Sequence, residues 1–393
     1  MDTIYLGWFG LVIGFVLWWW NEYWYVVPLK FKCSKSATKL PPGHMGFPII
    51  GEMISFLWYF KIVRRPDDFI NAKRRKYGDG DGMFRTHLFG VPSIIVYNAS
   101  VHKYVLHTED IFKAEWPTIE LMGRTSMVAV HGKAHTRVRS FVTNAINRPE
   151  ALNRIAAHVQ PRMVIALRSW AQTGKINARL ETQKLTFDNI GKLFMSMEPG
   201  PLLQSMDKLY QALLLGVRAY PINIPGFAYH RALQEENMAL RKERPEDFIT
   251  PKDVSNLKYT NKVVEEVIRM ANVAACAFRK SDTEVNYKGY KIPKGWNVIL
   301  MLRYLHTNSE NFKDPMCFNP DRWDEPAKAG SYQPFGGGQR LCPGNTLARI
   351  QLALLLHHLS IGYKWELINP NANIGYLSHP APIDGVEVKF DTL

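Results

Sequence analysis

Cysteine is scarce in this sequence, and no two cysteines stand close together. The chain has 393 residues and four cysteines, Cys33, Cys276, Cys317 and Cys342. Without a CxxC pair, the sequence favours neither a zinc site nor a disulfide framework, and a reducing compartment is expected. Dense basic runs with interleaved aromatic residues, which are typical of nucleic-acid binding, are also missing. The net charge of +14 therefore fits an anionic membrane face or an acidic protein partner, or solvated side chains scattered over the surface.

The N-terminus has no charge from Thr3 to Trp20, a run that just reaches the length of a membrane-spanning helix. No positive charge precedes the run and no small-residue cleavage site follows it, which argues against a removed signal peptide. Tryptophans and tyrosines at 18–25 are typical of a membrane interface, and the lysines at 30–39 place the rest of the chain in the cytosol. We predict a single transmembrane anchor over residues 1–28. A buried amphipathic helix is the alternative.

The rest of the chain has mainly helical periodicity with short strands. Residues 29–51 form a basic and Pro/Gly-rich segment that predicts a rigid hinge, and residues 52–393 form the main domain. The pattern predicts a β-hairpin over 81–98, helices over most of 99–220, strands over 285–300 and a buried helix over 345–359. The expected fold class is mainly α with small antiparallel β-sheets.

The surroundings of Cys342 are unusual for a structural cysteine. Three glycines at 336–338 let a flat ligand approach the backbone, and Pro343–Gly344 sharpens the turn into the helix that follows. Backbone N–H groups at that helix start favour a thiolate. Phe335 can shield the sulfur, and Arg340 can bind a carboxylate. These features fit a thiolate-ligated haem iron, while a glycine-rich loop with an inert cysteine is the alternative.

A second cluster of charged residues precedes this segment. Glu266 and Arg269 stand three residues apart on one face of an otherwise apolar predicted helix, and Arg322 lies in the sequence FNPDRW. A glutamate held by two arginines is a buried network that could fix the loop ahead of Cys342. An ordinary surface salt bridge between Glu266 and Arg269 is the alternative.

These motifs together resemble those of the cytochrome P-450 family. Phe335-x-x-Gly338-x-Arg340-x-Cys342-x-Gly344 resembles its haem-binding signature, and Glu266-x-x-Arg269 resembles its K-helix motif. Pro320-x-Arg322 resembles the motif that completes the Glu–Arg–Arg triad, although Trp323 stands where the family more often has Phe.

The resemblance implies a haem-thiolate monooxygenase that uses haem b (iron protoporphyrin IX), with Cys342 as the catalytic axial ligand of the iron. It also implies electrons from NADPH through the NADPH–cytochrome P-450 reductase, and a catalytic domain on the cytosolic face of the endoplasmic reticulum membrane. Two further segments resemble propionate-binding positions of the family. The sequence GKAHTRVR implies His135 and Arg139, and AFRK implies Arg279. Each could instead be a solvent-facing base.

Several segments, among them FNPDRWDEPAKAGSYQPFGGGQRLCPG, resemble the plant branch of the family that oxidises terpenoids and steroids. The resemblance is to ent-kaurenoic acid oxidase-like enzymes of gibberellin synthesis, some relatives of which oxidise triterpenes. By this resemblance, residues 116–130, 273–278 and 376–379 line a pocket for a hydrophobic terpenoid substrate. These segments are largely apolar, as such a pocket requires.

The oxygen-activating central helix of the family is missing from this chain. No Ala-Gly-x-Asp/Glu-Thr/Ser pattern occurs, and the sequence FAYHRALQEENMALRKERPEDF joins regions between which the family has several helices. We therefore expect an incomplete P-450 fold with an internal deletion near residues 233–236. Two hypotheses follow: an active monooxygenase, or a non-catalytic truncated or spliced isoform.

Overall fold

The computed structural model describes residues 8, 14–33, 39–117, 124–197, 200, 203, 206, 237–238, 240, 248–376 and 380–393. The expected deletion near residues 233–236 lies outside this range. The chain forms two compact units. The first comprises residues 1–136, 274–311 and 328–341, and the second comprises residues 137–273, 312–327 and 342–393. Each unit is therefore built from segments far apart in the sequence.

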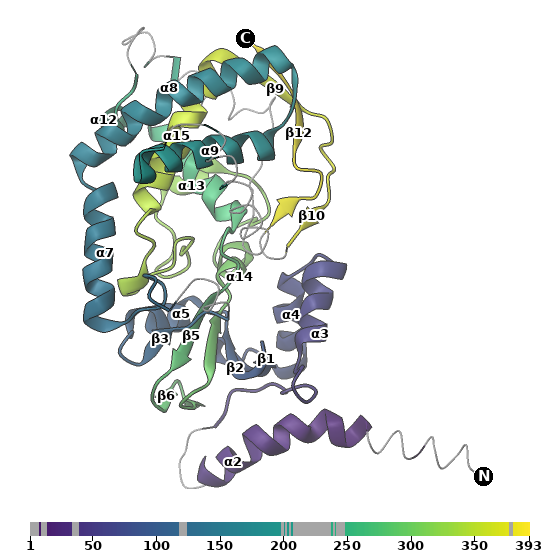
Figure 1. The fold of residues 1–393 in the computed structure, drawn as a ribbon. Coiled ribbons are helices and arrows are strands. Elements are labelled where there is room, and N and C mark those ends of the chain that lie inside the picture. Colours follow the sequence, from purple (N-terminus) through teal and green to yellow (C-terminus); the bar gives the residue numbers. More distant parts are fainter. Residues whose placement is uncertain are drawn as a thin grey trace. The chain divides into compact units, whose positions relative to one another are not determined.

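The first unit contains a five-stranded sheet in the order β1-β2-β8-β5-β3 (Figure 1). Strands β1 (Met83–Leu88) and β2 (Val91–Val96) form the predicted hairpin. Phe89 and Gly90 both have positive φ at its turn, as a tight hairpin turn requires. The remaining strands are β3 (Phe112–Ala114), β5 (Ala277–Ser281) and β8 (Asn297–Leu300).

One pairing in this sheet corrects the prediction of antiparallel sheets. Strand β2 pairs with β8 in parallel, with Ser93 opposite Asn297 and Val96 opposite Leu300. The other pairs of the sheet are antiparallel. A parallel pair needs a long connection, and the chain between β2 and β8 provides one. The predicted strands over 285–300 are otherwise confirmed by β8 and by the hairpin of β6 (Val285–Tyr287) and β7 (Tyr290–Ile292).

The apolar core of the first unit lies on this sheet. Ile94 and Val96 of β2 pack with Val298 and Leu300 of β8, and all four are fully buried. The short helices of the first unit are η1 (Glu22–Val26), α2 (Val27–Cys33), α3 (Met53–Leu57), η2 (Trp58–Ile62), α4 (Asp67–Tyr77), η3 (Gly80–Gly82), α5 (Ala99–His107), α14 (Leu302–Thr307) and η5 (Gly338–Arg340).

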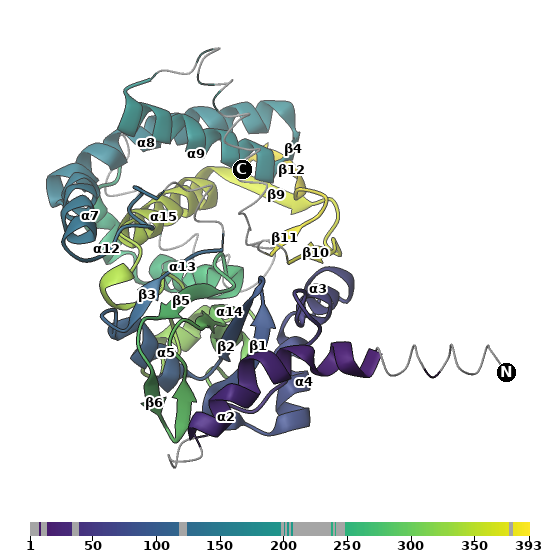
Figure 2. The same cartoon turned by 60° about the horizontal axis from the view of Figure 1, so that its bottom comes forward.

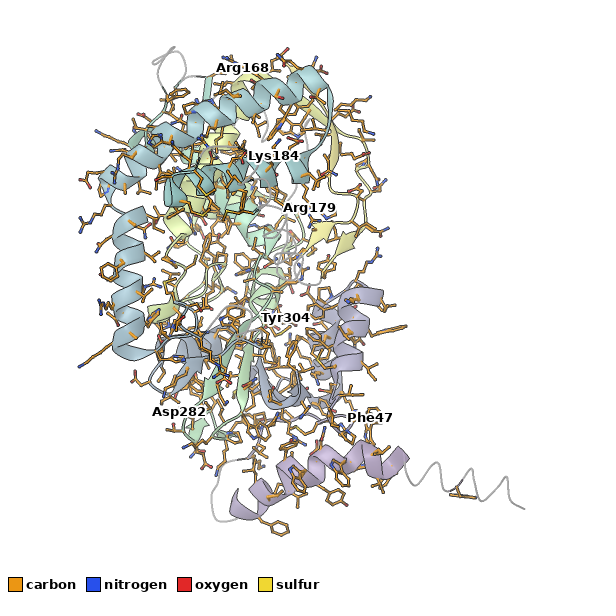
Figure 3. All side chains as sticks on the ribbon, viewed as in Figure 1. Phe47, Arg168, Arg179, Lys184, Asp282 and Tyr304 are labelled. Atoms are coloured by element: carbon orange, nitrogen blue, oxygen red, sulfur yellow. The ribbon has the colours of Figure 1, made fainter. Side chains whose placement is uncertain are left out.

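The Pro/Gly segment expected to be a hinge forms hydrogen bonds and ring contacts with the N-terminal helical residues and with strand β1. The Glu22 carboxylate accepts a hydrogen bond from the backbone N–H of Met45 at 3.0 Å and pairs with Arg85 of β1 at 3.4 Å. Arg85 in turn donates to the carbonyl of Pro41 at 2.8 Å. The ring of Phe47 lies 4.9 Å from the ring of Trp18, beside the N-terminal helical residues (Figure 3).

The N-terminal helical residues are therefore docked on the first unit. Val26 of η1 is fully buried in its core, and Asn21 and Glu22 are nearly so. None of the helices in the described part of the chain has both the length and the apolar character that a membrane span needs. Residues 1–7 and 9–13 of the predicted anchor lie outside the described range.

The second unit is mainly helical. Its helices are α7 (Gly132–Ile146, which begins in the first unit), α8 (Pro149–Thr173), α9 (Ala178–Met195), α12 (Pro251–Asn256), α13 (Lys258–Ala271), η4 (Pro320–Asp324) and α15 (Asn345–Gly362). Strands β4 (Lys175–Asn177), β12 (Glu387–Thr392) and β9 (Tyr363–Leu367) form an antiparallel sheet (Figure 2). Strands β10 (Ile374–Gly375) and β11 (Ala381–Pro382) form a small antiparallel pair.

Sequence signals account for the helices α13 and α15. Helix α13 is strongly amphipathic: Val263, Val264 and Ile268 are buried on one face, and Asn272 ends the helix in the left-handed conformation. Helix α15 was predicted to be buried, and each of its residues is buried or half-buried. It packs against α8 and α13 within the second unit, and its partners there explain its apolar sequence.

Candidate functional site

Glu266 on α13 is the centre of a buried hydrogen-bond network. Its Oε1 accepts from Arg269 Nη2 at 2.8 Å, from Arg322 Nε at 3.0 Å and from the backbone N–H of Asn319 at 2.9 Å. Its Oε2 accepts from Arg269 Nε at 2.8 Å. The structure thus brings together Glu266, Arg269 and Arg322, and the alternative of a surface salt bridge does not apply because the Glu266 and Arg269 side chains are fully buried.

Opposing effects act on the Glu266 carboxyl. Burial alone would raise its pKa, but the hydrogen bond and charge of Arg269, the N–H of Asn319 and the charge of Arg322 outweigh burial and lower it. The Arg269 guanidinium also lies 5.2 Å from the centre of the Phe312 ring, in cation–π contact. The carboxylate is therefore held ionised between two cations.

Trp323 is a member of this network that the sequence analysis treated only as a departure from the family pattern. Its indole Nε1 donates to Glu266 Oε2 at 3.1 Å. A phenylalanine at this position would have no such donor. The signal that could have identified Trp323 is its position directly after Arg322. Both residues lie on the short η4 helix, from which both side chains bind Glu266.

Arg322 also fixes the loop that precedes it. Its guanidinium donates to the carbonyl oxygens of Lys313 at 2.8 Å, Asp314 at 3.3 Å and Cys317 at 3.1 Å. The Arg322 side chain therefore links this loop to Glu266 of α13 by hydrogen bonds.

Cys342 belongs to the second unit and lies at the start of α15. Its carbonyl oxygen accepts from the side chain of Asn345 at 2.9 Å and from the backbone N–H of Asn345 at 3.3 Å. Asn147, after the end of α7, donates to the neighbouring carbonyl of Pro343 at 2.8 Å. The N–H of Asn345 thus points to the Cys342 carbonyl rather than to the sulfur. The thiol is half-buried and is in no disulfide.

The glycines and the arginine that precede Cys342 belong to the first unit. Gly338 has φ +63°, and a Cβ built on it would lie 2.0 Å from the carbonyl oxygen of Leu106, so only glycine fits against the end of α5. Arg340 is strongly bound: it pairs with Glu109 Oε1 at 2.5 Å and donates to the carbonyls of Met127 and Val130. Phe335 is half-buried in the same unit.

Arg279 on β5 tests whether this part of the first unit fits a haem propionate. Its side chain is almost fully buried, and within the described residues its one hydrogen bond goes to the carbonyl of its neighbour Phe278. Burial lowers its pKa to about 10, partly offset by the charge of Glu109. Arg279 and Arg340 together carry one positive charge more than Glu109 neutralises. A buried cation in excess fits an additional anion such as a propionate.

The remaining predicted residues are placed less specifically. His135 and Arg139 lie four residues apart on α7, with His135 buried and Arg139 half-buried. Of the segments expected to line the substrate pocket, residues 118–123 and 377–379 lie outside the described range. The ring of Phe278 lies 5.5 Å from that of Trp116 and 5.4 Å from that of Phe89, which forms an aromatic cluster in the first unit.

Comparisons with known proteins agree with these observations. The model of the family described as Cytochrome P-450 matches residues 41–218 and 228–375. Ent-kaurenoic acid oxidase 1 of Arabidopsis thaliana is 32% identical, over 88% of this chain and 89% of that relative. Ent-kaurenoic acid oxidase 2 of the same plant is 30% identical, over 96% of each chain. Both relatives are thus similar along nearly their whole length.

A solved structure is similar as well. The retinoic acid-bound cyanobacterial CYP120A1 matches with a TM-score of 0.73 and 20% sequence identity, over 91% of this chain and 100% of that one. The likeness concerns the fold, which is mainly helical with small sheets. The alignment with Ent-kaurenoic acid oxidase 1 spans 440 positions, more than the 393 residues of this chain, so that relative has residues without a counterpart here.

Proposed function

Because this chain belongs to the cytochrome P-450 family, we propose that it is a haem-thiolate monooxygenase that hydroxylates a terpenoid or steroid-like substrate. Enzymes of this family use a haem iron and electrons from a redox partner. The observation that carries the proposal is the buried Glu266 network in the unit that also holds Cys342 at the start of α15. Burying charged groups costs free energy unless each of them is paired. The presence of this network therefore favours a role in holding the loop before Arg322 in one geometry.

The residues of this chain have separate roles in the proposal. Cys342 would hold the haem iron through its sulfur, and haem b, when bound, would supply the oxygen-activating chemistry. Arg279 and Arg340 would hold propionates, as would His135 and Arg139. The excess positive charge at Arg279 and Arg340 supports the first pair. Phe335 would shield the sulfur from water, and Gly338 and Gly344 would let the chain turn closely around it.

The proposed substrate is of the kind oxidised in gibberellin or triterpenoid biosynthesis. The names of the relatives, ent-kaurenoic acid oxidases, support a diterpene acid. The aromatic cluster of Phe89, Trp116 and Phe278 supports an apolar substrate, because two of its members come from the segments expected to line the pocket. Hydroxylation at such a pocket needs oriented apolar contact more than charge.

The proposed location is the endoplasmic reticulum membrane, with an anchor in the part of residues 1–28 that precedes the docked Asn21 and Glu22, and with the catalytic domain in the cytosol. The uncharged N-terminal run and the lysines that follow it support this placement. Electrons would come from NADPH through the NADPH–cytochrome P-450 reductase. The basic surplus of the chain suits an acidic protein partner.

A second candidate function is a non-catalytic truncated or spliced isoform. Two observations favour it: the family match is interrupted between residues 218 and 228, and the alignment with a relative is longer than this chain. The motif of the oxygen-activating helix is also missing from the sequence. A chain that lacks this helix would keep the haem-binding signature without the group that delivers protons to oxygen.

The carbon monoxide difference spectrum of the reduced 393-residue chain is the first step in separating the two candidates, and turnover of a terpenoid substrate is the second. A red-shifted, thiolate-type band is expected if the chain holds haem through Cys342, and screening with diterpene acids and triterpenes would follow. The absence of this band would assign the chain to the non-catalytic class. Genomic sequence that encodes the missing helix at an exon boundary would identify splicing or a gene-model error.

A further inference from the structure

Helix α13 carries two adjacent glutamates that bind different parts of the second unit. Glu266 binds the arginines described above, whereas Glu265 faces α15. Arg349 of α15 donates to Glu265 through Nε at 2.5 Å and through Nη2 at 3.1 Å. This two-pronged pairing is the strongest arrangement that an arginine and a carboxylate can form. About a quarter of each side chain is exposed, so water screens the pair only in part.

Arg349 continues this contact towards Cys342. Its Nη1 lies 3.5 Å from the carbonyl oxygen and 3.4 Å from the side-chain oxygen of Asn345, one turn earlier in α15. Asn345 then donates twice to the Cys342 carbonyl, from its side chain and from its backbone. A continuous path of hydrogen bonds therefore runs from Glu265 through Arg349 and Asn345 to the backbone of Cys342.

The orientation of Asn345 depends on this path. The Asn345 amide can donate to the Cys342 carbonyl only when its nitrogen faces that carbonyl. Arg349 can only donate hydrogen bonds, and it contacts the amide oxygen of Asn345. Arg349 therefore selects the orientation of the amide in which the nitrogen faces Cys342. The residue before α15, Gly344, has no side chain to cap the helix. Asn345 therefore fixes the turn that joins Cys342 to α15.

We propose that Glu265, Arg349 and Asn345 are positioning residues that hold the Cys342 backbone in the geometry its thiolate needs. The functional role of this positioning rests on the proposed haem ligation by Cys342. The positioning itself can be measured in the haem-free chain. We expect that loss of the Glu265–Arg349 pair loosens the Cys342 turn while the hydrogen bonds of the adjacent Glu266, which involve other partners, remain formed.

The test uses R349M and E265Q in the full chain, with R349K as the conservative variant and K262M as the control. Lys262 lies on the same helix and pairs with Asp324, away from α15. The first readout is amide hydrogen exchange of residues 342–350 in the haem-free chain. R349M and E265Q should speed exchange about tenfold, the size expected for a lost charged pair, and K262M should not. R349K keeps the positive charge but cannot form two parallel hydrogen bonds, so its exchange rate should lie between those of the unchanged chain and R349M.

The second readout is the fraction of bound haem that gives the thiolate-type carbon monoxide band. R349M and E265Q should lower this fraction, and R349K should restore part of it. Wild-type exchange in both R349M and E265Q, or equal acceleration in K262M, would overturn the inference. If the unchanged chain takes up no haem while R349M still speeds exchange, the positioning stands and the proposed oxygenase function fails.

Discussion

Replacing Glu266 by alanine would leave the buried guanidinium of Arg269 without its carboxylate partner. Both side chains have no exposed surface, and Glu266 accepts hydrogen bonds from four different residues. Breaking a buried ion pair by removing one partner costs about 3–5 kcal/mol, because the remaining charge is uncompensated. The cation–π contact between Arg269 and the Phe312 ring is present with or without Glu266, so it does not offset this loss.

The loss is large relative to the stability of an ordinary domain, about 5–15 kcal/mol. We therefore expect E266A to fold only marginally and to take up little haem. Urea unfolding followed by far-UV circular dichroism measures the first effect, and haem content per chain measures the second. The matched control is E366A: Glu366 lies in the same unit, exposed, 4.0 Å from Lys389, where a pair contributes about 0–1 kcal/mol.

The pH dependence gives an independent check on the same residue. The native pKa of Glu266 is lowered, so its carboxylate stabilises the fold above the ordinary carboxyl value of 4.5, and this contribution is lost as pH falls through the lowered native value. E266Q should abolish that part of the acid dependence. The reasoning is refuted if E266A costs no more than E366A, or if E266Q and the unchanged chain unfold in acid alike.

Three other changes test neighbouring parts of the argument. W323F removes one donor to Glu266, so we expect a loss of about 1.5–3 kcal/mol and acid unfolding at higher pH than in the unchanged chain; equal acid midpoints would exclude a role for the indole N–H. C342A should abolish the thiolate-type carbon monoxide band, and a retained band would mean that Cys342 is not the ligand of the haem iron. Deleting residues 1–20 should release the chain from membranes and cost ring contacts such as those of Trp18 with His44 and Phe47. Deleting residues 1–28 should destabilise the chain more, because Glu22 and Val26 are also lost; sedimentation and urea unfolding distinguish the two.

The elements with a clear periodicity were predictable from the sequence. The hairpin of β1 and β2, the strands near residues 285–300 and the buried helix α15 follow from alternation, turn residues and a continuous apolar run. The parallel pairing of β2 with β8 was not, because the partners are far apart in the chain and no local signal relates them. The docking of the N-terminal helical residues through Asn21 and Glu22 corresponds only to the alternative prediction of a buried helix, since hydropathy does not distinguish a helix that faces lipid from one that faces protein.

The candidate site was predictable where motifs fixed the residue types. The sequence identified Glu266, Arg269 and Arg322 as possible partners, and the structure brings them together. The partners of these residues were not predictable: the Trp323 donor and the pairing of Arg340 with Glu109 depend on which side chains meet across separate segments. Spacing along the chain restricts neighbours on one helix but leaves contacts between helices open.

The parallel pair of β2 and β8 has a consequence for chain length. The first unit is assembled from the two ends of a long connection, and most of the second unit lies within that connection. The entropy cost of closing such a connection grows only with the logarithm of its length, so shortening it by a third changes the cost by about 0.4 kcal/mol. The sheet of the first unit is therefore almost indifferent to how many residues the intervening segment contains. Residues can be lost from that segment over evolution, or by skipping an exon, with only a fraction of a kcal/mol of change in the closure cost for the strands that pair across it.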